Sequence, residues 1–170
     1  MPVKIIIVGD THARFFKELP NEMIDEIQEA DRVIHVGDYM SKDVLDGFIE
    51  IKGQAFEGVY GNADPQAIRN KVPAKKIIEI SGKRIGITHP AIGGPSEISK
   101  KRVLATFKED NVDIIVYGHT HDSEIDKRDN LLMINPGKGY LEENSFGPPT
   151  SIVLLTIGEK VKVKILEINA

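Results

Sequence analysis

The sequence predicts an α/β fold whose last third is antiparallel. In the first two-thirds, short apolar runs bounded by Gly, Pro, Asn or Asp alternate with segments of helical period, as in βαβ units. After residue 121 the apolar runs are separated only by tight turns, which indicates hairpins of antiparallel strands. No repeat, low-complexity tract or linker divides the chain, so we expect a single domain over residues 1–170.

The first part contains six apolar runs that we expect to be strands, because each is short and ends at turn-forming residues. These strands cover residues 4–9, 32–37, 54–61, 75–80, 84–89 and 113–118. Helices are expected over residues 20–30, from residue 41 to about 52 and from residue 96 to about 110. Met23, Ile27 and Ala30 form an apolar stripe on the first helix, and Ser41 and Ser96 are N-caps of the other two.

Four further strands are expected in the last third, over residues 123–128, 131–137, 150–157 and 161–168. Short turns join them in pairs. Lys and Val alternate in the final strand, so one of its faces covers a core and the other meets water.

The composition limits the chemistry of the chain. It has no cysteine, which excludes disulfides and thiolate ligands, so any metal must be held by His, Asp, Glu or Asn. The net charge of −4 provides no field for a long polyanion, and we expect no duplex nucleic acid as a partner. No apolar segment reaches the roughly 18 residues of a membrane span, and the N-terminus has no signal-peptide pattern. We therefore expect no membrane as a partner and a cytoplasmic location.

Five of the predicted strands end in a short polar cluster. The runs read IIIVGDTH, VIHVGDY, GVYGNAD, IGITHP and IIVYGHTH. Because ligands bind at the carboxyl ends of strands in α/β sheets, we expect these clusters to be neighbours in space. Together they supply two carboxylates, one amide oxygen and four of the five histidines: Asp10, His12, Asp38, Asn62, His89, His119 and His121.

This mixture of side chains suits two divalent metal ions. A carboxylate can bridge two cations and offset their repulsion, while neutral imidazoles complete the ligand shells without adding charge. Imidazole and oxygen ligands together favour Mn, Fe, Co, Ni or Zn over Ca or Mg, and we expect Mn first. Two such ions about 3.5–4 Å apart stabilise the attacking and leaving oxygens in phosphoryl transfer.

Each cluster also has a purely structural interpretation. The GD pairs are typical of turns, and Asn62 can occupy a left-handed turn position. Asp64 followed by Pro65 is a good N-cap and N1 pair, and His35 is expected to be a packed or supporting histidine rather than a ligand. The metal site is favoured by the ordered set of D-x-H, GD, GN, H and GH-x-H, each at a strand end.

Two basic features allow more than one interpretation. Lys138, in the run INPGKG, either reaches a substrate phosphate or is a solvated lysine after a Pro–Gly turn. Residues 99–103, SKKRV, are expected to be a solvated helix face rather than a phosphate-binding patch.

The ordered motifs, from Gly9 to His121, resemble those of the calcineurin-like metallophosphoesterase superfamily. Within it, the small size and the runs GDTH, YGN, YGHTH and INPG look like the bacterial and archaeal phosphodiesterase group that also includes the retromer scaffold subunit. The resemblance implies a four-layer αββα sandwich, in which two mixed sheets pack together with helices outside. It also implies a small phosphodiester as substrate.

The resemblance further implies roles for the seven polar residues. One metal is expected to be held by Asp10, His12, Asp38 and His121, and the other by Asp38, Asn62, His89 and His119. Asp38 is the expected bridge. A hydroxide between the metals is expected to attack phosphorus in line, with a catalytic set of Asp38, Asn62, His89 and His119.

Two positions depart from the family pattern. Ala63 stands where many relatives have a histidine that binds phosphate or protonates the leaving group, so no dedicated general acid is expected there. Such an enzyme prefers activated leaving groups, which argues against a protein phosphatase. Pro90 follows His89 where relatives commonly have glycine; it stiffens the loop and removes a hydrogen-bond donor.

The leading expectation is a dinuclear metal-dependent phosphoesterase. Its rival is an interaction scaffold of the retromer type that keeps a metal site without significant catalysis. Every ligand position is filled by a competent residue, and a scaffold has no physical need for seven convergent ligands, so the enzyme is favoured. A single-metal or regulatory protein follows if Pro90 displaces His89, and a homo-oligomer is compatible with the sequence.

Overall fold

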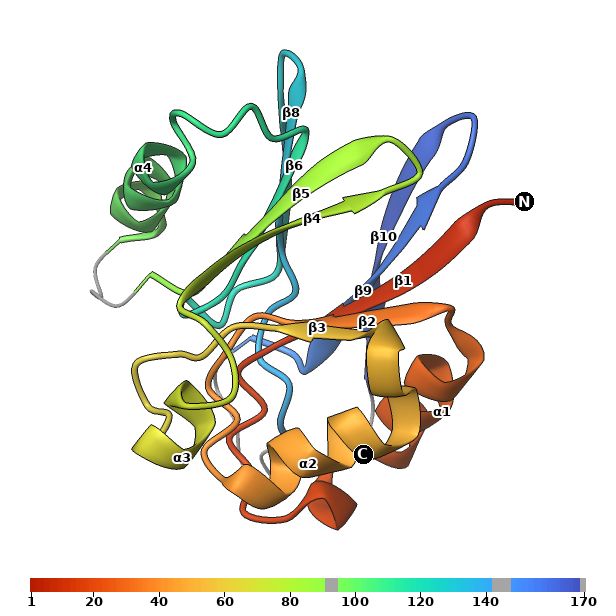
Figure 1. Cartoon of the computed structure of the whole chain (residues 1–170), viewed down its shortest axis with the longest axis vertical. Helices are drawn as coiled ribbons and strands as arrows, with labels where there is room; N and C mark the ends of the chain where they lie inside the picture. Colours follow the sequence, from red (N-terminus) through yellow and green to blue (C-terminus); the bar gives the residue numbers. More distant parts are fainter. Residues whose placement is uncertain (91–94, 142–147, 169–170) are drawn as a thin grey trace.

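Two β-sheets pack face to face with helices outside them in the computed structural model, which describes residues 1–90, 95–141 and 148–168 (Figure 1). Sheet A has the spatial order β10 (Val161–Glu167), β9 (Ser151–Ile157), β1 (Val3–Val8), β2 (Arg32–His35) and β3 (Phe56–Gly58). Sheet B has the order β4 (Lys75–Ile80), β5 (Lys83–Thr88), β6 (Ile114–Tyr117), β8 (Leu131–Asn135) and β7 (Glu124–Arg128). Each sheet contains both parallel and antiparallel pairs.

The helices form the two outer layers of the sandwich. On the side of sheet A lie α1 (Asn21–Glu29), α2 (Lys42–Lys52) and α3 (Gln66–Arg69), and on the side of sheet B lies α4 (Ser96–Thr106) (Figure 1). Two short 3-10 helices, η1 (Phe16–Glu18) and η2 (Gly53–Ala55), precede α1 and follow α2. The predicted four-layer αββα architecture is confirmed.

Three apolar clusters hold the four layers together. Alternate residues of β1 enter two of them: Ile6 joins Phe48 of α2 in the cluster under the helices, and Ile7 joins Val116 of β6 in the cluster between the sheets. The third cluster, with Phe107, lies between sheet B and α4. Because β1 is buried on both faces, the loop that follows it leaves the sheet from a rigid base.

Several predicted element boundaries differ from the structure. The strand expected at 54–61 shortens to β3, because the chain turns at Gly53 (φ +54°) and forms η2 first. Ser41 is the N-cap of α2 as predicted, whereas the N-cap of α4 is Pro95 and not Ser96. α4 also ends earlier than predicted, because the backbone leaves helical geometry at Phe107.

The last third forms two antiparallel hairpins, as predicted, but the hairpins belong to different sheets. β7 and β8 pair in sheet B, and β9 and β10 pair in sheet A. β8 also lies parallel to β6 on its other side. It ends two residues earlier than predicted, before Pro136 and Gly137 (φ +82°) turn the chain out of the sheet.

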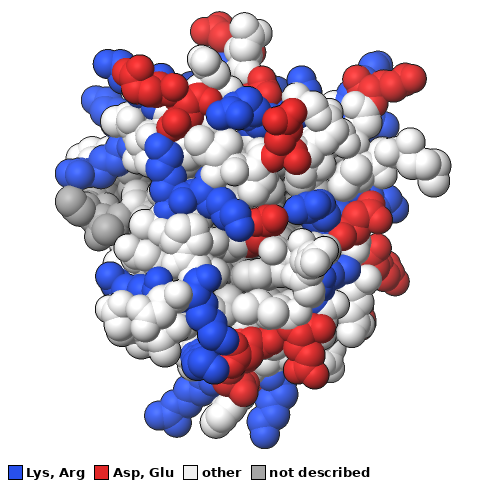
Figure 2. All heavy atoms as spheres, in the orientation of Figure 1, with Lys and Arg blue, Asp and Glu red and all other residues white. Residues whose placement is uncertain are grey.

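The surface seen in Figure 2 carries acidic and basic side chains that are interspersed rather than segregated. This mixing agrees with the small net charge of the chain. In the described ranges, no helix is both long and apolar enough to cross a bilayer.

Candidate metal centre

The seven predicted ligands lie together at one edge of the sandwich. They follow β1, β2 and β3 of sheet A and β5 and β6 of sheet B, whose parallel pairing places their carboxyl ends side by side. Six of them form two sets whose ligand atoms lie within 4.8 Å of one another. We call Asp10, His12 and His121 group one, and Asp38, His89 and His119 group two.

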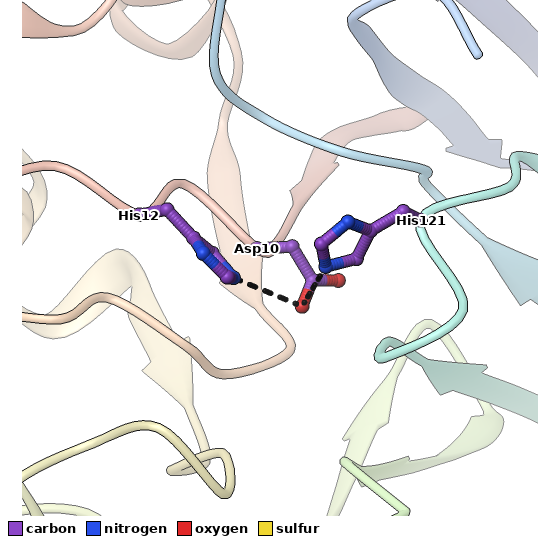
Figure 3. A group of neighbouring side chains, drawn as sticks. All are labelled: Asp10, His12 and His121. Carbon is purple, nitrogen blue, oxygen red and sulfur yellow. Dashed lines mark ion pairs between the residues drawn. The ribbon is translucent and has the colours of Figure 1, made fainter. Parts of the chain in front are cut away.

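Group one consists of two imidazoles that face one buried carboxylate (Figure 3). Nε2 of His12 and Nε2 of His121 lie 3.8 and 3.5 Å from Asp10 Oδ1. Asp10 Oδ1 and His12 Nε2 are buried, and neither has a hydrogen-bond partner among the described residues. Buried polar atoms rarely stay unsatisfied, so a cation at this position fits the donor set.

Group two is organised around the side chain of Asn62. Its Oδ1 lies 2.9 Å from His89 Nε2 and 3.0 Å from His119 Nδ1. The other ring nitrogen of His89, Nδ1, donates to the carbonyl oxygen of Val36 at 2.9 Å. That bond directs Nε2 toward the site, as in metal-binding histidines. Pro90 therefore leaves His89 in group two.

Asp38 lies between the two groups. Its Oδ2 is 3.5 Å from His12 Nε2 and 3.3 Å from His89 Nε2. Its Oδ1 accepts a hydrogen bond from the Ala63 N–H at 2.8 Å, which fixes the carboxylate. A Cβ at Gly61 would lie 2.1 Å from Asp38 Oδ1, so glycine is required for this approach.

Five of the seven residues have a left-handed backbone conformation, with φ between +42° and +89°: Asp10, His12, Asp38, His119 and His121. Such angles are uncommon outside glycine and cost about 1 kcal/mol or more each. Hydrogen bonds between loops hold them in place, including Asp10 N–H to Gly37 O at 2.9 Å and His119 N–H to Asp10 Oδ2 at 3.1 Å. The loops therefore orient these side chains toward one another at the cost of backbone strain.

Asp64 connects two of these loops. Its buried carboxylate accepts hydrogen bonds from the N–H groups of Asp38, Met40 and Gly61 at 2.8, 2.9 and 2.7 Å. The prediction that it caps a helix is wrong, since α3 has Pro65 as N-cap and no side-chain cap. The short helix starts at Gln66, and Asp64 instead holds the backbone of Asp38 in position.

The site's charged groups change one another's pKa values. Burial lowers the pKa of the His12 imidazole, but the carboxylates of Asp10 and Asp38 outweigh it and raise that pKa to about 9. Burial favours the neutral acid at Asp38, yet His12 and His89 lower the pKa of Asp38 well below its usual range. The ionised carboxylates attract cations, and a cation that binds His12 must displace its proton.

His35 is fully buried behind the ligands, in agreement with the packed or supporting role expected from the sequence. Its Nδ1 accepts from the Gly37 N–H at 3.0 Å, so Nε2 carries the proton that is shared with Thr11 Oγ1, also at 3.0 Å. Its ring stacks on Tyr39 at 3.7 Å between centroids. Burial lowers its pKa to about 3, so it stays neutral while it joins the loops after β1 and β2.

Each of the two basic features contains a lysine that is buried, although the sequence allowed a solvated lysine at 138 and predicted a solvated helix face at 99–103. Lys138 is 3% exposed and is therefore not a solvated lysine; its Nζ lies 5.2 Å from the centroid of the Tyr140 ring. In the SKKRV segment, Lys100 is 4% exposed and pairs with Glu124 and Asp126, the latter at 3.1 Å. The expectation of a solvated face is wrong at that residue, which joins α4 to β7.

Sequence reasoning missed two residues near the ligands. Asp64 appeared only as a helix cap, although its place three residues after Gly61 was a signal that it serves the same loop. Tyr140 was not considered; its ring lies 5.2 Å from the ring of His12 and 5.8 Å from that of His121. Tyr140 lies beyond every motif, so the sequence contained no signal for this contact.

Two mixed sheets with grouped carboxylate and imidazole side chains at one edge are the arrangement expected of a metal-dependent phosphoesterase. Residues 3–160 match the model of the calcineurin-like phosphoesterase superfamily domain, and the chain belongs to this family. The probable metallophosphoesterase MJ0623 of Methanocaldococcus jannaschii is 33% identical over 166 residues, which cover 96% of this chain and 80% of the relative. Phosphodiesterase MJ0936 of the same organism is 30% identical, with 97% of this chain and 100% of the relative covered.

Solved structures show the same fold. The structure of a novel archaeal phosphodiesterase has a TM-score of 0.72 and 25% identity, and covers 98% of this chain and 100% of that one. Vps29 from Entamoeba histolytica in complex with Zn²⁺ also has a TM-score of 0.72, with 20% identity and the same coverage. The predicted family membership is confirmed, and both observed ligand groups agree with a metal-dependent family.

Proposed function

We propose that the chain is a phosphodiesterase that uses two divalent metal ions and hydrolyses small phosphodiesters. The observation that carries the proposal is the position of Asp38 Oδ2, which adjoins His12 of group one at 3.5 Å and His89 of group two at 3.3 Å. A ligand shared by two closely spaced cations needs such a position. The 30% identity to a phosphodiesterase supports the choice of diester substrates.

The ligand chemistry supports a first-row transition metal. Four imidazoles accompany two carboxylates and one amide oxygen, and hard cations such as Ca²⁺ prefer oxygen alone. We propose Mn²⁺ as the resident metal, with Fe, Co, Ni and Zn as alternatives. Group one and Asp38 would hold one ion, and group two with Asn62 would hold the other.

Two such cations, when bound, supply hydroxide near neutral pH and offset the charge that develops on the phosphoryl group. The chain's own residues provide orientation. Val36 O accepts a hydrogen bond from His89 Nδ1 at 2.9 Å and so orients its Nε2, and the Ala63 N–H fixes Asp38. Ligands that are held before substrate arrives need no reorganisation during the reaction.

Leaving-group protonation has no dedicated residue at position 63. The side chain of Ala63 cannot donate a proton, and its backbone N–H is occupied by Asp38 Oδ1. Solvent or one of the site histidines must protonate the leaving group. Diesters with activated leaving groups are therefore the preferred substrates.

The alternative is an interaction scaffold that retains a metal site without significant catalysis. The likeness to Vps29 concerns the fold alone, and the sequence contains a complete set of seven ligands. Five of these seven residues have a strained backbone, which costs folding free energy. A scaffold has no need for this strain.

The test is hydrolysis of bis-p-nitrophenyl phosphate by metal-stripped protein, with and without added Mn²⁺ or Ni²⁺. We expect turnover that returns with metal and that the Asp38→Ala protein lacks. Absence of turnover with every metal, in protein that binds two ions, would favour the scaffold.

A further inference from the structure

We propose that a small pocket beside group one receives an uncharged, single-ring substituent of the substrate. The inference rests on the proposed phosphodiesterase function and specifies its substrate class. The pocket has a volume of about 140 Å³. The side chains that matter in its lining are His12, Glu18, Leu19, Pro20, Tyr140 and Leu141.

The pocket adjoins the metal centre directly, because His12 belongs to both. The Tyr140 ring also lines the pocket, and it lies 5.2 Å from the His12 ring and 5.8 Å from the His121 ring. A phosphoester held at group one therefore has a substituent within reach of the pocket.

The larger hollow lined by Met1 and Lys160 lies at the opposite end of β1 and cannot serve the same phosphoryl group. A neighbouring hollow of about 330 Å³ shares Leu19, Pro20 and Leu141 with the pocket, but its lining does not include His12. The substituent is therefore assigned to the part that His12 and Tyr140 line.

The size and lining of the pocket select the substituent. An apolar cavity of about 150 Å³ accommodates benzene, so a volume of about 140 Å³ is sufficient for one ring. Leu19 and Pro20 are buried and apolar, Leu141 is 41% exposed at the mouth, and the Tyr140 ring offers an aromatic contact.

The charge of the pocket excludes anionic substituents. With His12 engaged at group one, Glu18 is the only charged side chain among the described residues that line the pocket, and it is negative. A carboxylate or a second phosphate placed here would be repelled. The geometry thus favours aryl diesters over diesters of polyphosphates or of anionic alcohols.

The test compares phenylphosphonate and methylphosphonate as ligands of the Mn²⁺-loaded protein by isothermal titration calorimetry. Both present the same phosphonate to the metal centre, and they differ only in the ring. We expect phenylphosphonate to bind about tenfold more tightly, because the ring loses contact with water. In Tyr140→Ala and Leu141→Ser the preference should fall to about twofold or less. Phe15→Ala is the matched control, since Phe15 is 49% exposed and does not line the pocket.

A second variant tests whether Glu18 repels anionic substituents, through an expected increase in affinity for one of them. Glu18 is exposed, so Glu18→Lys should fold normally. It should raise the affinity for 4-carboxyphenylphosphonate, relative to phenylphosphonate, by about fivefold or more. An unchanged ratio would contradict the assigned role of Glu18.

Equal affinities for the two phosphonates in the unmodified protein would overturn the proposed role of the pocket. A preference for phenylphosphonate that persists in Tyr140→Ala would overturn it as well. Binding requires no turnover, so the outcomes separate the two proposals. A ring preference without diester hydrolysis would reject the proposed function and keep the pocket. Diester hydrolysis without a ring preference would do the reverse.

Discussion

Groups one and two contain the same kinds of side chain but hold them differently. In group two, His89 is oriented through both ring nitrogens, by Val36 O and by Asn62 Oδ1. In group one, the imidazoles of His12 and His121 are 25% and 30% exposed and face Asp10 across 3.8 and 3.5 Å. Group two is therefore organised without a cation, whereas group one leaves buried atoms for a cation to satisfy.

Because of this difference, we expect the two groups to bind their ions with different affinities. A preorganised site loses less conformational freedom on binding. Both groups must release a proton, because burial lowers the pKa of His89 and that of His12 but the carboxylates outweigh it and raise both. We expect two binding steps, with group two filled first.

The largest effect is expected for Asp38→Ala, which removes the carboxylate that adjoins both groups. Both ions should be lost, and turnover should fall about 10³-fold or more. Metal content after equilibration with Mn²⁺ and gel filtration measures the loss, with Asp25→Ala on the exposed face of α1 as the control. Retention of one ion would contradict a shared ligand.

The next effect separates the groups. His89→Ala should weaken binding at group two, and His12→Ala at group one, each by about 100-fold or more with the other step preserved. Calorimetric titration of metal-free protein with Mn²⁺ resolves the two steps. If either variant abolished both steps, the division into two groups would be wrong.

A smaller effect is expected from Asp64→Asn, which keeps the size of the side chain but replaces one acceptor oxygen by an amide. At least one of three buried N–H groups loses its partner, which costs about 1–3 kcal/mol of folding free energy. Mn²⁺ affinity should fall about 10- to 100-fold, because Asp38 loses its backbone support. Urea unfolding and calorimetry measure the two effects, and Asp25→Asn is the control. Wild-type affinity in a destabilised Asp64→Asn protein would show that Asp64 supports the fold and not the ligands.

The last effect is a pH dependence of metal binding at group one, which needs no change in the sequence. Because the folded pKa of His12 is raised to about 9, Mn²⁺ affinity at group one should increase about tenfold per pH unit between pH 7 and pH 9 and then level off. In metal-free protein the sign is opposite. The stability from charged His12 is complete below its unfolded pKa near 6.5 and is lost as pH rises through about 9. His12→Gln should flatten the profile of metal binding at group one and reduce the slope of the stability profile. A group-one binding slope that survives the substitution would assign the proton elsewhere.

The convergence of the seven polar residues could be predicted from local pattern, whereas the four layers were predicted only through the resemblance to a known family. Apolar runs mark strands, and the polar residues at their carboxyl ends converge whatever the loops do. The partners of Asp64 could not be predicted, because they depend on positive φ angles at Asp38 and Met40 that no residue pattern indicates. The division of the last two hairpins between the sheets was equally inaccessible, since β8 and β9 are separated by a connection whose path the turn residues do not specify.

The left-handed backbone at five ligand residues bears on how such a chain diverges. A change to glycine at Asp10, His12, Asp38, His119 or His121 removes a ligand and relieves backbone strain of about 1 kcal/mol or more. In a lineage that no longer needs the metal, substitution of these residues by glycine would therefore lower the conformational energy of the backbone. Metal binding, as proposed, and the hydrogen bonds that Asp10 and Asp38 accept from His119 N–H and Ala63 N–H oppose such a substitution.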